Sequence, residues 1–365
     1  MQFVEASRVL TPNGFRGPTR VSFEHGLIAA VEPIDTAPPI TLVPGFVDVQ
    51  VNGIDDVDVA HADGADWERL DALLLAQGVT TWCPTLVTNR LERYSAPLAR
   101  IAEAMERSAE RRPSIAGAHL EGPFLGGAPG AHPPALIVPI DLEWLAALPP
   151  HVALVTVGAE RADAVEATRR LVADGRLVSI GHTTAAEAQF DAVVAAGARL
   201  TTHLFNGMSG VHHRSPGVAV FAMTNPDVCA SIIADGVHVH PRVVRLAFQA
   251  LGPGRVVLVT DAVAWRAGSV GSIGMSLRDG APRLPDGTLA GSVVTMDQAI
   301  RVCVGAGVDL ADAVTAASTT PAQLLALDDR GCIEVGRRAD LVALDGQLQV
   351  QQVWIAGEPT QQRTA

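Results

Sequence analysis

The sequence has few cysteines, few aromatic residues and no excess of positive charge. Only four of its 365 residues are cysteines, and they form neither a Cys-x-x-Cys pair nor a disulfide-like pattern, as is typical of a reducing compartment. Aromatic residues make up 4% of the chain, and the formal net charge is −12. This acidic balance argues against binding to nucleic acid or to an anionic membrane. An anionic ligand would therefore need a local basic pocket.

Long apolar runs are also missing. No uninterrupted apolar stretch is long enough to span a bilayer, and the first residues contain no apolar core of a signal peptide. Together with the scattered cysteines, this favours a cytoplasmic protein. Small aliphatic residues are plentiful instead, and 48% of the chain is hydrophobic. That composition is typical of a parallel sheet that is buried on both faces.

Short apolar runs that end in polar residues recur along the chain, and most lead into a helical pattern. The predicted strands are residues 46–51, 79–82, 115–120, 152–157, 177–180, 200–204, 230–233 and 256–259. The clearest predicted helices between them are residues 65–77, 91–110 and 162–173. Eight strand–helix alternations predict an α/β protein with a (β/α)8 TIM-type barrel. A doubly wound open sheet is the alternative, although no glycine-rich dinucleotide or phosphate loop follows the first strand.

Both ends of the chain have strand-like patterns. These are residues 2–4, 20–23 and 27–31 at the start, and residues 332–335, 339–344 and 350–355 at the end. Helical patterns at residues 294–304, 310–318 and 321–327 precede the last group. We expect the two ends to pair into one small accessory domain, formed by residues 1–43 and 331–365. Residues 44–330 would then form the barrel.

Residues 176–208 are predicted to form a strand, a helix and a second strand. Thr184 is a good helix N-cap, and Glu187 stands three residues later, which is the spacing of a capping box. In a parallel βαβ unit both strands end at the same edge of the sheet. His182 and His203 therefore should lie side by side. Either histidine alone could equally be a hydrogen-bonded structural residue, but two at adjacent strand ends favour a metal site.

Four charged or titratable residues lie at or just after the ends of predicted strands: Glu121, His182, His203 and Asp261. The active sites of barrels lie at the carboxyl ends of the strands, so these side chains should converge on one rim. One carboxylate and two imidazoles match the ligands of a catalytic zinc that keeps a position for water. Asp261 has the chemistry of a general base for that water. Two structural alternatives stay open: Glu121 could pair with Arg266, and Asp261 could cap a following helix.

Seven short segments, taken in order, carry a family pattern. They are PGFVDVQVNG (44–53), HLEGPF (119–124), GHT (181–183), THLFNGM (202–208), IADGVH (233–238), LVTDA (258–262) and GTLAGS (287–292). With this set the chain resembles the N-acetylglucosamine-6-phosphate deacetylases of the amidohydrolase superfamily over nearly its whole length. The resemblance implies a (β/α)8 barrel with a small β-sandwich from both termini, a divalent metal, and deacetylation of an amino-sugar phosphate.

The resemblance also implies roles for single residues. By matching position, Glu121, His182 and His203 would hold the metal. Asp261 would be the base that later protonates the amine, and His132 would steady the carbonyl oxygen as it becomes an oxyanion. Taken alone, His132 could be a solvated loop histidine. Contacts to the sugar and the acetyl group are implied for Ala131, His132, Asn206, Gly207, Leu289, Ala290 and Gly291.

The first strand bears on the number of metals. Many amidohydrolases carry His-x-His there and bind two metals, whereas this chain has Gln50 and Asn52. Neutral amides are poor zinc ligands. We therefore expect one tightly held divalent metal, with Zn²⁺ the first candidate, and only a remnant of a second site at Gln50 and Asn52.

Residues His212, His213 and Arg214 form a basic cluster in this acidic chain. The cluster could be an ordinary solvated loop, but arginine suits bidentate binding of phosphate. The resemblance implies that Arg214 reaches the phosphate in a neighbouring active site and that His238 also binds it. The expected assembly is therefore a homodimer with shared sites.

The expected reaction is metal-dependent hydrolysis of N-acetyl-D-glucosamine 6-phosphate to D-glucosamine 6-phosphate and acetate. Alternative substrates are another N-acetyl sugar phosphate, such as N-acetylgalactosamine 6-phosphate, or an N-acyl compound without phosphate. A catalytically inactive scaffold is a remote alternative. The chain departs from the family at Asp55 and Asp56, where glycines are common, and at Trp265, in a stretch that is usually small and could shape the pocket.

Overall fold

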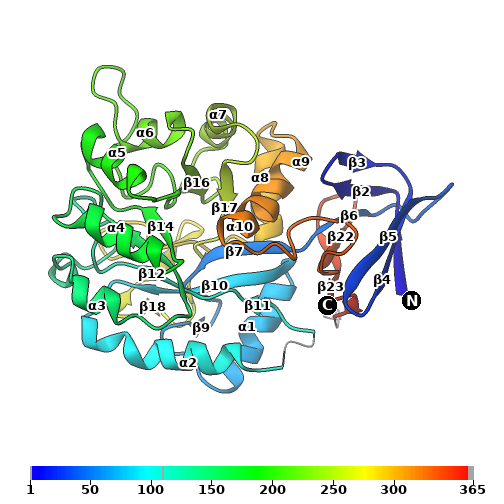
Figure 1. Ribbon diagram of the computed structural model, residues 1–365, viewed down its shortest axis with the longest axis horizontal. Helices are drawn as coiled ribbons and strands as arrows, with labels where there is room; N and C mark the ends of the chain where they lie inside the picture. The colour runs from blue at the N-terminus through cyan, green and yellow to red at the C-terminus, as the bar shows by residue number, and fades with distance from the viewer. Residues whose placement is uncertain (1, 109–110, 361–365) are drawn as a thin grey trace.

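A barrel of parallel strands forms the larger part of the molecule (Figure 1). The computed structural model describes residues 2–108 and 111–360, and within them the barrel has eight strands. In order they are β7 (Phe46–Val51), β10 (Val79–Val87), β12 (Ala118–Glu121), β13 (Val152–Val157), β14 (Leu177–Ile180), β15 (Leu200–Thr201), β16 (Cys229–Ile232) and β17 (Val256–Leu258). Each pairs in parallel with the next, and β11 (Ser114–Ile115) adds to β10.

The barrel closes between its first and last strands. Val51 and Ala262 form a parallel bridge, Asp261 N–H donates to Gln50 O (3.0 Å), and Asn52 N–H donates to Ala262 O (2.9 Å). The alternative of an open, doubly wound sheet is therefore wrong, and the predicted (β/α)8 barrel is confirmed. The seam between the two strands also carries the predicted base, Asp261.

Helices cover the outside of the barrel (Figure 1). They are α1 (Ala65–Leu75), α2 (Ser95–Met105), α3 (Leu142–Ala146), α4 (Ala164–Ala173), α5 (Glu187–Ala195), α6 (Val218–Thr224), α7 (Pro241–Leu251), α8 (Met296–Gly305), α9 (Leu310–Ala317) and α10 (Thr319–Leu324), with short 3-10 turns η1 (Leu91–Arg93) and η2 (Pro134–Leu136). The predicted helix 91–110 is split into η1 and α2, and its last two residues lie outside the described residues. No helix in the described ranges has the length and apolar character to cross a bilayer.

Helix α7 shows how local sequence produces these elements. Pro241 occupies its first turn, where the missing N–H costs no hydrogen bond. Val244, Phe248 and Leu251 recur at helical spacing and are buried against the barrel. Gly252 ends the helix with a φ of 75°, a left-handed conformation that glycine adopts without strain.

Helix α5 begins differently from the prediction. Its N-cap is Ala186, whose N–H donates to Gln189 Oε1 (2.9 Å). The predicted capping box of Thr184 and Glu187 is therefore wrong. The N–H of Thr184 donates to Glu160 Oε1 (2.8 Å) instead, because the loop after β14 is held by a neighbouring strand end.

Strands from both termini form the small domain, and the N- and C-terminal ends lie there together (Figure 1). One sheet has the order β1 (Gln2–Ala6), β4 (Thr19–Glu24), β5 (Leu27–Pro33). The other has the order β24 (Glu358–Pro359), β23 (Val350–Ile355), β22 (Leu341–Leu344), β6 (Thr41–Pro44), β2 (Arg8–Thr11), β3 (Gly14–Arg16). Val21, Phe23, Leu42 and Leu341 belong to their shared apolar core.

The expected small β domain is thus present, but one predicted strand is not. Residues 332–335 form no strand, although Ile333 is buried. The domain limits at residues 43/44 and 330/331 remain a proposal, and β6 (Thr41–Pro44) crosses the first of them.

Short hairpins interrupt the barrel between β17 and α8. They are β18 (Ser269–Val270) with β19 (Ile273–Gly274), and β20 (Ser276–Arg278) with β21 (Ala281–Arg283). A third hairpin, β8 (Gly53–Ile54) with β9 (Val57–Asp58), follows β7. None of the three was predicted, although Asp279-Gly280, between β20 and β21, is a typical hairpin turn sequence. Both turn residues have positive φ, 51° and 77°.

Candidate active site

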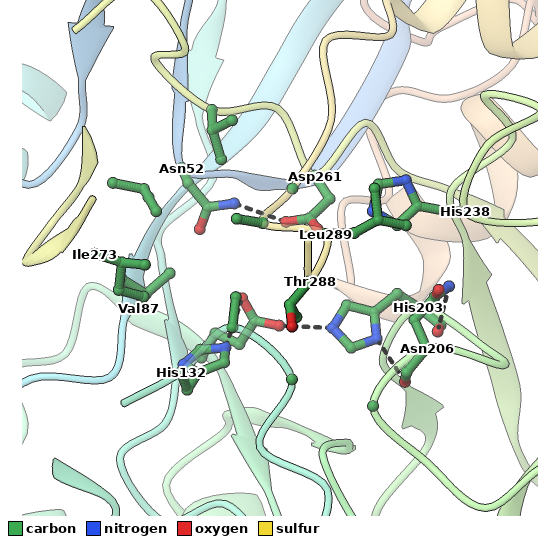
Figure 2. Close-up of a pocket in the computed structure, with 18 of the residues that line it drawn as sticks. Asn52, Val87, His132, His203, Asn206, His238, Asp261, Ile273, Thr288 and Leu289 are labelled. Atoms are coloured by element: carbon green, nitrogen blue, oxygen red, sulfur yellow. Dashed lines mark hydrogen bonds and ion pairs between the residues drawn. The ribbon is translucent and has the colours of Figure 1, made fainter. Parts of the chain in front are cut away.

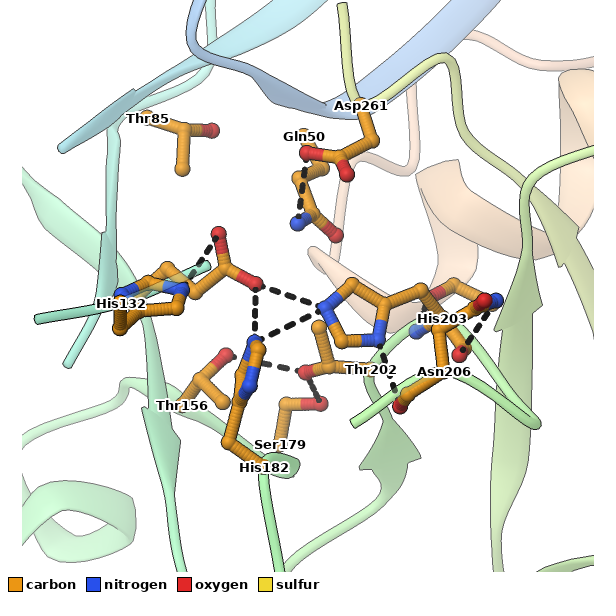
Figure 3. Close-up of polar contacts among 12 residues, drawn as sticks. Gln50, Thr85, His132, Thr156, Ser179, His182, Thr202, His203, Asn206 and Asp261 are labelled. Carbon is orange, nitrogen blue, oxygen red and sulfur yellow. Dashed lines mark hydrogen bonds and ion pairs between the residues drawn. The ribbon is translucent and has the colours of Figure 1, made fainter. Parts of the chain in front are cut away.

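Three predicted site residues share an unusual backbone conformation directly after strand ends. His182, His203 and Asp261 have φ values of 48°, 31° and 48°. Such left-handed conformations cost a non-glycine residue about 1 kcal/mol or more and cluster at functional sites. His203 lies within the predicted strand 200–204, and its positive φ is incompatible with a strand, so β15 ends at Thr201. Figure 3 shows the three side chains pointing toward a common centre.

Glu121, His182 and His203 come together as predicted and are buried. Glu121 Oε1 lies 3.1 Å from His182 Nε2 and 2.8 Å from His203 Nε2. The two Nε2 atoms are 3.1 Å apart. Strands β12, β14 and β15 therefore deliver one carboxylate and two imidazoles to a single point.

The outer ring nitrogens show what this point can bind. His182 Nδ1 lies 3.0 Å from Ala128 O, and His203 Nδ1 lies 3.2 Å from Asn206 O. A carbonyl oxygen only accepts hydrogen bonds, so each neutral ring must carry its proton on Nδ1. Both Nε2 lone pairs then face each other and the Glu121 carboxylate. This set of converging lone pairs fits a divalent metal, which would satisfy all three.

His132 lies beside this cluster. One ligand atom each of Glu121, His132 and His182 fall within 4.8 Å of one another, so His132 is a further metal donor by distance. Its Nδ1, however, receives Thr88 N–H (3.4 Å) and contacts Thr88 Oγ1 (2.8 Å). This places the proton on Nε2, 3.9 Å from Glu121 Oε2. Burial, and next the neighbouring His182, lower the pKa of His132 to about 3, so it is a neutral hydrogen-bond donor.

Asp261 is held by the two amides of the first strand. Its Oδ1 accepts hydrogen bonds from Gln50 Nε2 (3.1 Å) and Asn52 Nδ2 (2.7 Å). Burial, and next the charge of Glu121, raise the pKa of Asp261 to about 7. A bound dication would lower this value again. Figure 2 shows Asn52 directed at Asp261. The Oδ1 atom of Asn52 is buried without a hydrogen-bond partner in the described residues, so this atom can bind a ligand.

A cavity of about 410 Å³ opens over these groups. The predicted residues that line it are Asn52, Glu121, Ala131, His132, His182, His203, Asn206, Gly207, His238, Asp261, Leu289, Ala290 and Gly291. His238 Nδ1 pairs with Asp235 Oδ2 (2.7 Å), which leaves Nε2 for a ligand. Gln50 lies behind Asp261 and does not line the cavity.

Arg214 lies elsewhere, exposed in the loop between β15 and α6. It is not among the residues that line the cavity of its own chain.

The unpredicted hairpins complete the cavity. Val270 and Ile273 form an apolar wall with Val263. Arg283 also lines the cavity, and its Nε is buried without a partner in the described part of the chain. Its neighbouring guanidinium nitrogen donates to Gly287 O (2.8 Å). The Asp-Gly turn was the available sequence signal, but nothing in the sequence placed this hairpin against the site.

Several alternatives can now be set aside. Arg266 pairs with Asp55 (2.8 Å) rather than with Glu121. Asp261 caps no helix, because hairpins follow it. Trp265 does not line the cavity, and the Arg266 guanidinium lies 4.9 Å from its ring centre. These departures from the family pattern therefore lie outside the pocket.

The barrel interior below the site is also polar. His119 Nε2 contacts Thr156 Oγ1 (2.8 Å), and burial lowers the pKa of His119 to about 4. At the seam, Thr260 Oγ1 donates to Asp48 Oδ2 (2.6 Å). Burial raises the pKa of Asp48 to about 7. No role was predicted for either buried group.

Comparison with known proteins places this site in a family. The model of the Amidohydrolase family matches residues 41–360. This chain belongs to the amidohydrolase family. Among curated amidohydrolase relatives, N-acetylgalactosamine-6-phosphate deacetylase of Escherichia coli O157:H7 is 35% identical over 97% of this chain and 98% of its own. N-acetylglucosamine-6-phosphate deacetylase of Bos taurus is 36% identical over 87% of this chain and 82% of its own.

Solved structures agree with this placement. A mutant N-acetyl-D-glucosamine-6-phosphate deacetylase from Mycobacterium smegmatis, in complex with N-acetyl-D-glucosamine-6-phosphate, has 33% identity and a TM-score of 0.92, and covers 98% of both chains. The Thermotoga maritima enzyme has 31% identity and a TM-score of 0.92, over 98% of this chain and 99% of that one. The predicted resemblance of this chain to the N-acetylglucosamine-6-phosphate deacetylases is thus confirmed.

Proposed function

We propose that this amidohydrolase removes the acetyl group from N-acetyl-D-glucosamine 6-phosphate. The observation that carries the proposal is the convergence of Glu121, His182 and His203 beside Asp261 at one end of the barrel. Three metal donors beside a carboxylate that is not itself one of them suit the hydrolysis of an amide. The relatives, whose names state this activity or its galactosamine counterpart, supply the substrate class.

Glu121, His182 and His203 would hold one divalent metal, and we propose Zn²⁺. Bound there, the metal would lower the pKa of water and polarise a carbonyl group. Gln50 and Asn52 donate to Asp261 rather than offering imidazoles, which supports a single tightly held ion.

Asp261 takes the proton from the attacking water, whose oxygen forms a bond to the acetamide carbon. It then gives that proton to the amine nitrogen as the C–N bond breaks, so the products are acetate and the amino sugar. The amides of Gln50 and Asn52 hold Oδ1, which leaves Oδ2 for the proton. His132 Nε2–H donates to the carbonyl oxygen as negative charge develops on it.

The phosphate needs cations in a chain of net charge −12. Within one subunit, His238 and Arg283 line the cavity. Arg214 would add a guanidinium from a second subunit, so the proposed assembly is a homodimer. Asn206, Gly207 and the turn at residues 289–291 would contact the sugar and the acetyl group. A cytoplasmic location suits the scattered cysteines and an intracellular sugar phosphate.

The galactosamine epimer is the second candidate substrate, because two of the curated relatives carry that name. The test measures acetate release from both N-acetylhexosamine 6-phosphates and from unphosphorylated N-acetylglucosamine, with the metal content of the same sample. Turnover of the glucosamine phosphate in preference to the other two, with about one metal per chain, is expected. Preference for the galactosamine phosphate would reassign the substrate. Turnover of no sugar by metal-loaded protein would contradict the proposed substrate and move it to another N-acyl compound.

A further inference from the structure

Glu160 follows β13 and joins two loops at the mouth of the barrel. Its Oε1 accepts a hydrogen bond from Gly127 N–H (2.7 Å), in the loop after β12, and another from Thr184 N–H (2.8 Å), in the loop after β14. The hydroxyl of Thr183 donates to Oε2. One half-buried carboxylate thus ties the loop after β12 to the segment that directly follows His182.

The loop after β12, which Glu160 holds, also contacts the imidazole of His182. Ala128, the residue after Gly127, supplies the carbonyl that faces His182 Nδ1 at 3.0 Å. Gly126, the residue before Gly127, donates its N–H to His182 O (2.8 Å). The loop held by the carboxylate therefore fixes both the backbone and the ring of His182, whose Nε2 lies 3.1 Å from Glu121 Oε1.

Two glycines leave the space that this arrangement needs. A Cβ atom on Gly126 would lie 2.2 Å from Glu160 Oε1, and one on Gly158 would lie 2.3 Å from Gly126 N. Neither position can carry a side chain without moving the loop or the carboxylate. The sequence is thus adapted to the close approach of these three segments.

The carboxylate is ionised around neutral pH. Burial by itself raises the pKa of Glu160, but the hydrogen bonds from Thr183, Thr184 and Gly127 outweigh burial, so the net shift is downward. An ionised carboxylate accepts from all of these donors at once.

We infer that Glu160 is the positioning residue of the metal ligand His182. It holds the loop carbonyl that keeps the proton on Nδ1, and so presents the Nε2 lone pair to the metal. This inference rests on the proposed function only in treating Glu121, His182 and His203 as a metal site. Loss of the group that orients a metal-bound histidine typically weakens metal binding by about 10–100-fold.

The inferred role depends on hydrogen-bond geometry, so substitutions at Glu160 can separate it from an effect of negative charge alone. In Glu160→Gln the amide oxygen can accept from Gly127 and Thr184, and the amide nitrogen can donate to Thr183 Oγ1. Glu160→Asp keeps the charge but shortens the reach by one methylene, and Glu160→Ala removes every bond. If the negative charge alone mattered, the glutamine variant would fail and the aspartate variant would not.

The experiment measures Zn²⁺ affinity of the metal-free full chain by competition with a chromophoric chelator, with thermal unfolding of each metal-free variant in parallel. We expect about 10–100-fold weaker Zn²⁺ binding for Glu160→Ala and Glu160→Asp, and a change of about threefold or less for Glu160→Gln. The matched control is Asp340→Asn, since Asp340 also accepts a backbone N–H, that of Ala356, but in the small domain. Its Zn²⁺ affinity should equal that of the parent.

Unchanged Zn²⁺ affinity in a folded alanine or aspartate variant would overturn the inference, as would equal losses in the glutamine and alanine variants. If the alanine variant does not fold, the aspartate variant carries the same test. For a sugar that the parent hydrolyses, kcat of the alanine and aspartate variants should fall in proportion to their metal occupancy, and KM should not change. Because the affinity measurement uses no sugar, an error in the proposed substrate leaves its outcome intact.

Discussion

One wall of the cavity is built from the ends of barrel strands, and another from the hairpins inserted between β17 and α8. In the strand-end wall, Glu121 Oε1 lies within 3.1 Å of the Nε2 atoms of His182 and His203, and side-chain amides hold Asp261 beside them. The hairpin wall is apolar at Val270 and Ile273, and its outer strand β20 is exposed. The barrel thus supplies the chemistry, while the insertion shapes the space for the substrate, as is common in barrels whose loops vary.

Asp261→Asn should have the largest effect among single changes, because it removes the proton acceptor and leaves the shape of the strand-end wall. We expect kcat to fall by about a thousandfold or more, with KM changed by less than about threefold. Steady-state acetate release checks this, with Zn²⁺ content measured on the same samples. A kcat of the variant that stays at a tenth of the parent value or more would show that Asp261 is not the general base.

His132→Gln should cost less. The donor to the carbonyl oxygen is displaced while Asp261 and the metal donors stay in place, so kcat should fall by about a hundredfold. Zn²⁺ affinity should stay near that of the parent if His132 is a hydrogen-bond donor. A large loss of affinity would instead show that His132 is a metal ligand, as its distance to Glu121 and His182 permits.

Arg283→Met tests the hairpin wall. Methionine keeps much of the length of the side chain but removes the guanidinium, so KM for the phosphorylated sugar should rise by about tenfold while kcat changes little. Arg214→Met is the companion variant, and its effect should appear only in the dimer. Unchanged KM for Arg283→Met with raised KM for Arg214→Met would assign the phosphate to the second subunit alone.

Asp48→Asn tests the buried seam and should have the smallest effect, on stability rather than on activity. The pKa of Asp48 is about 7 in the folded chain and 3.8 as an ordinary aspartate. Between pH 4 and 7 the folded chain keeps a proton that the unfolded chain releases, so this group lowers the free energy of unfolding as pH rises.

The asparagine variant lacks that dependence. Its free energy of unfolding, relative to the parent, should therefore rise between pH 4 and 7 by about 1–2 kcal/mol, below the limit of about 4 kcal/mol that the two pKa values allow. The bonds to Thr260 that the variant weakens offset part of the gain at every pH. Denaturant unfolding at several pH values checks this, and parallel stability curves for the two proteins would contradict it.

Much of the barrel was predictable from sequence because its strands are rich in apolar residues and almost wholly buried. The pattern located all eight strands, and the polar residues after them indicated where the site would lie. It could not show the left-handed conformation of His203, which ends β15 before the predicted limit. The predicted strand at residues 332–335 failed because burial of Ile333 produces an apolar pattern without any strand pairing.

The candidate site, too, was predictable from the sequence only in part. Glu121, His182, His203 and Asp261 could be named because parallel strands bring their carboxyl ends to one edge. The amide donors to Asp261 were predicted only as a remnant metal site. Arg283 was missed, since the two strands of its hairpin have three residues each and carry little pattern of their own.

The sequence by itself determined the order of strands and helices, the residue types available at the strand ends and the acidic surface. These depend on local periodicity and composition, which need no knowledge of distant contacts. The tertiary structure alone decided which ring nitrogen of each histidine faces the centre, what holds Asp261, and which inserted segment closes the cavity. Each of these depends on a hydrogen bond or a contact between residues far apart in the chain, and such pairings appear only once the barrel has closed.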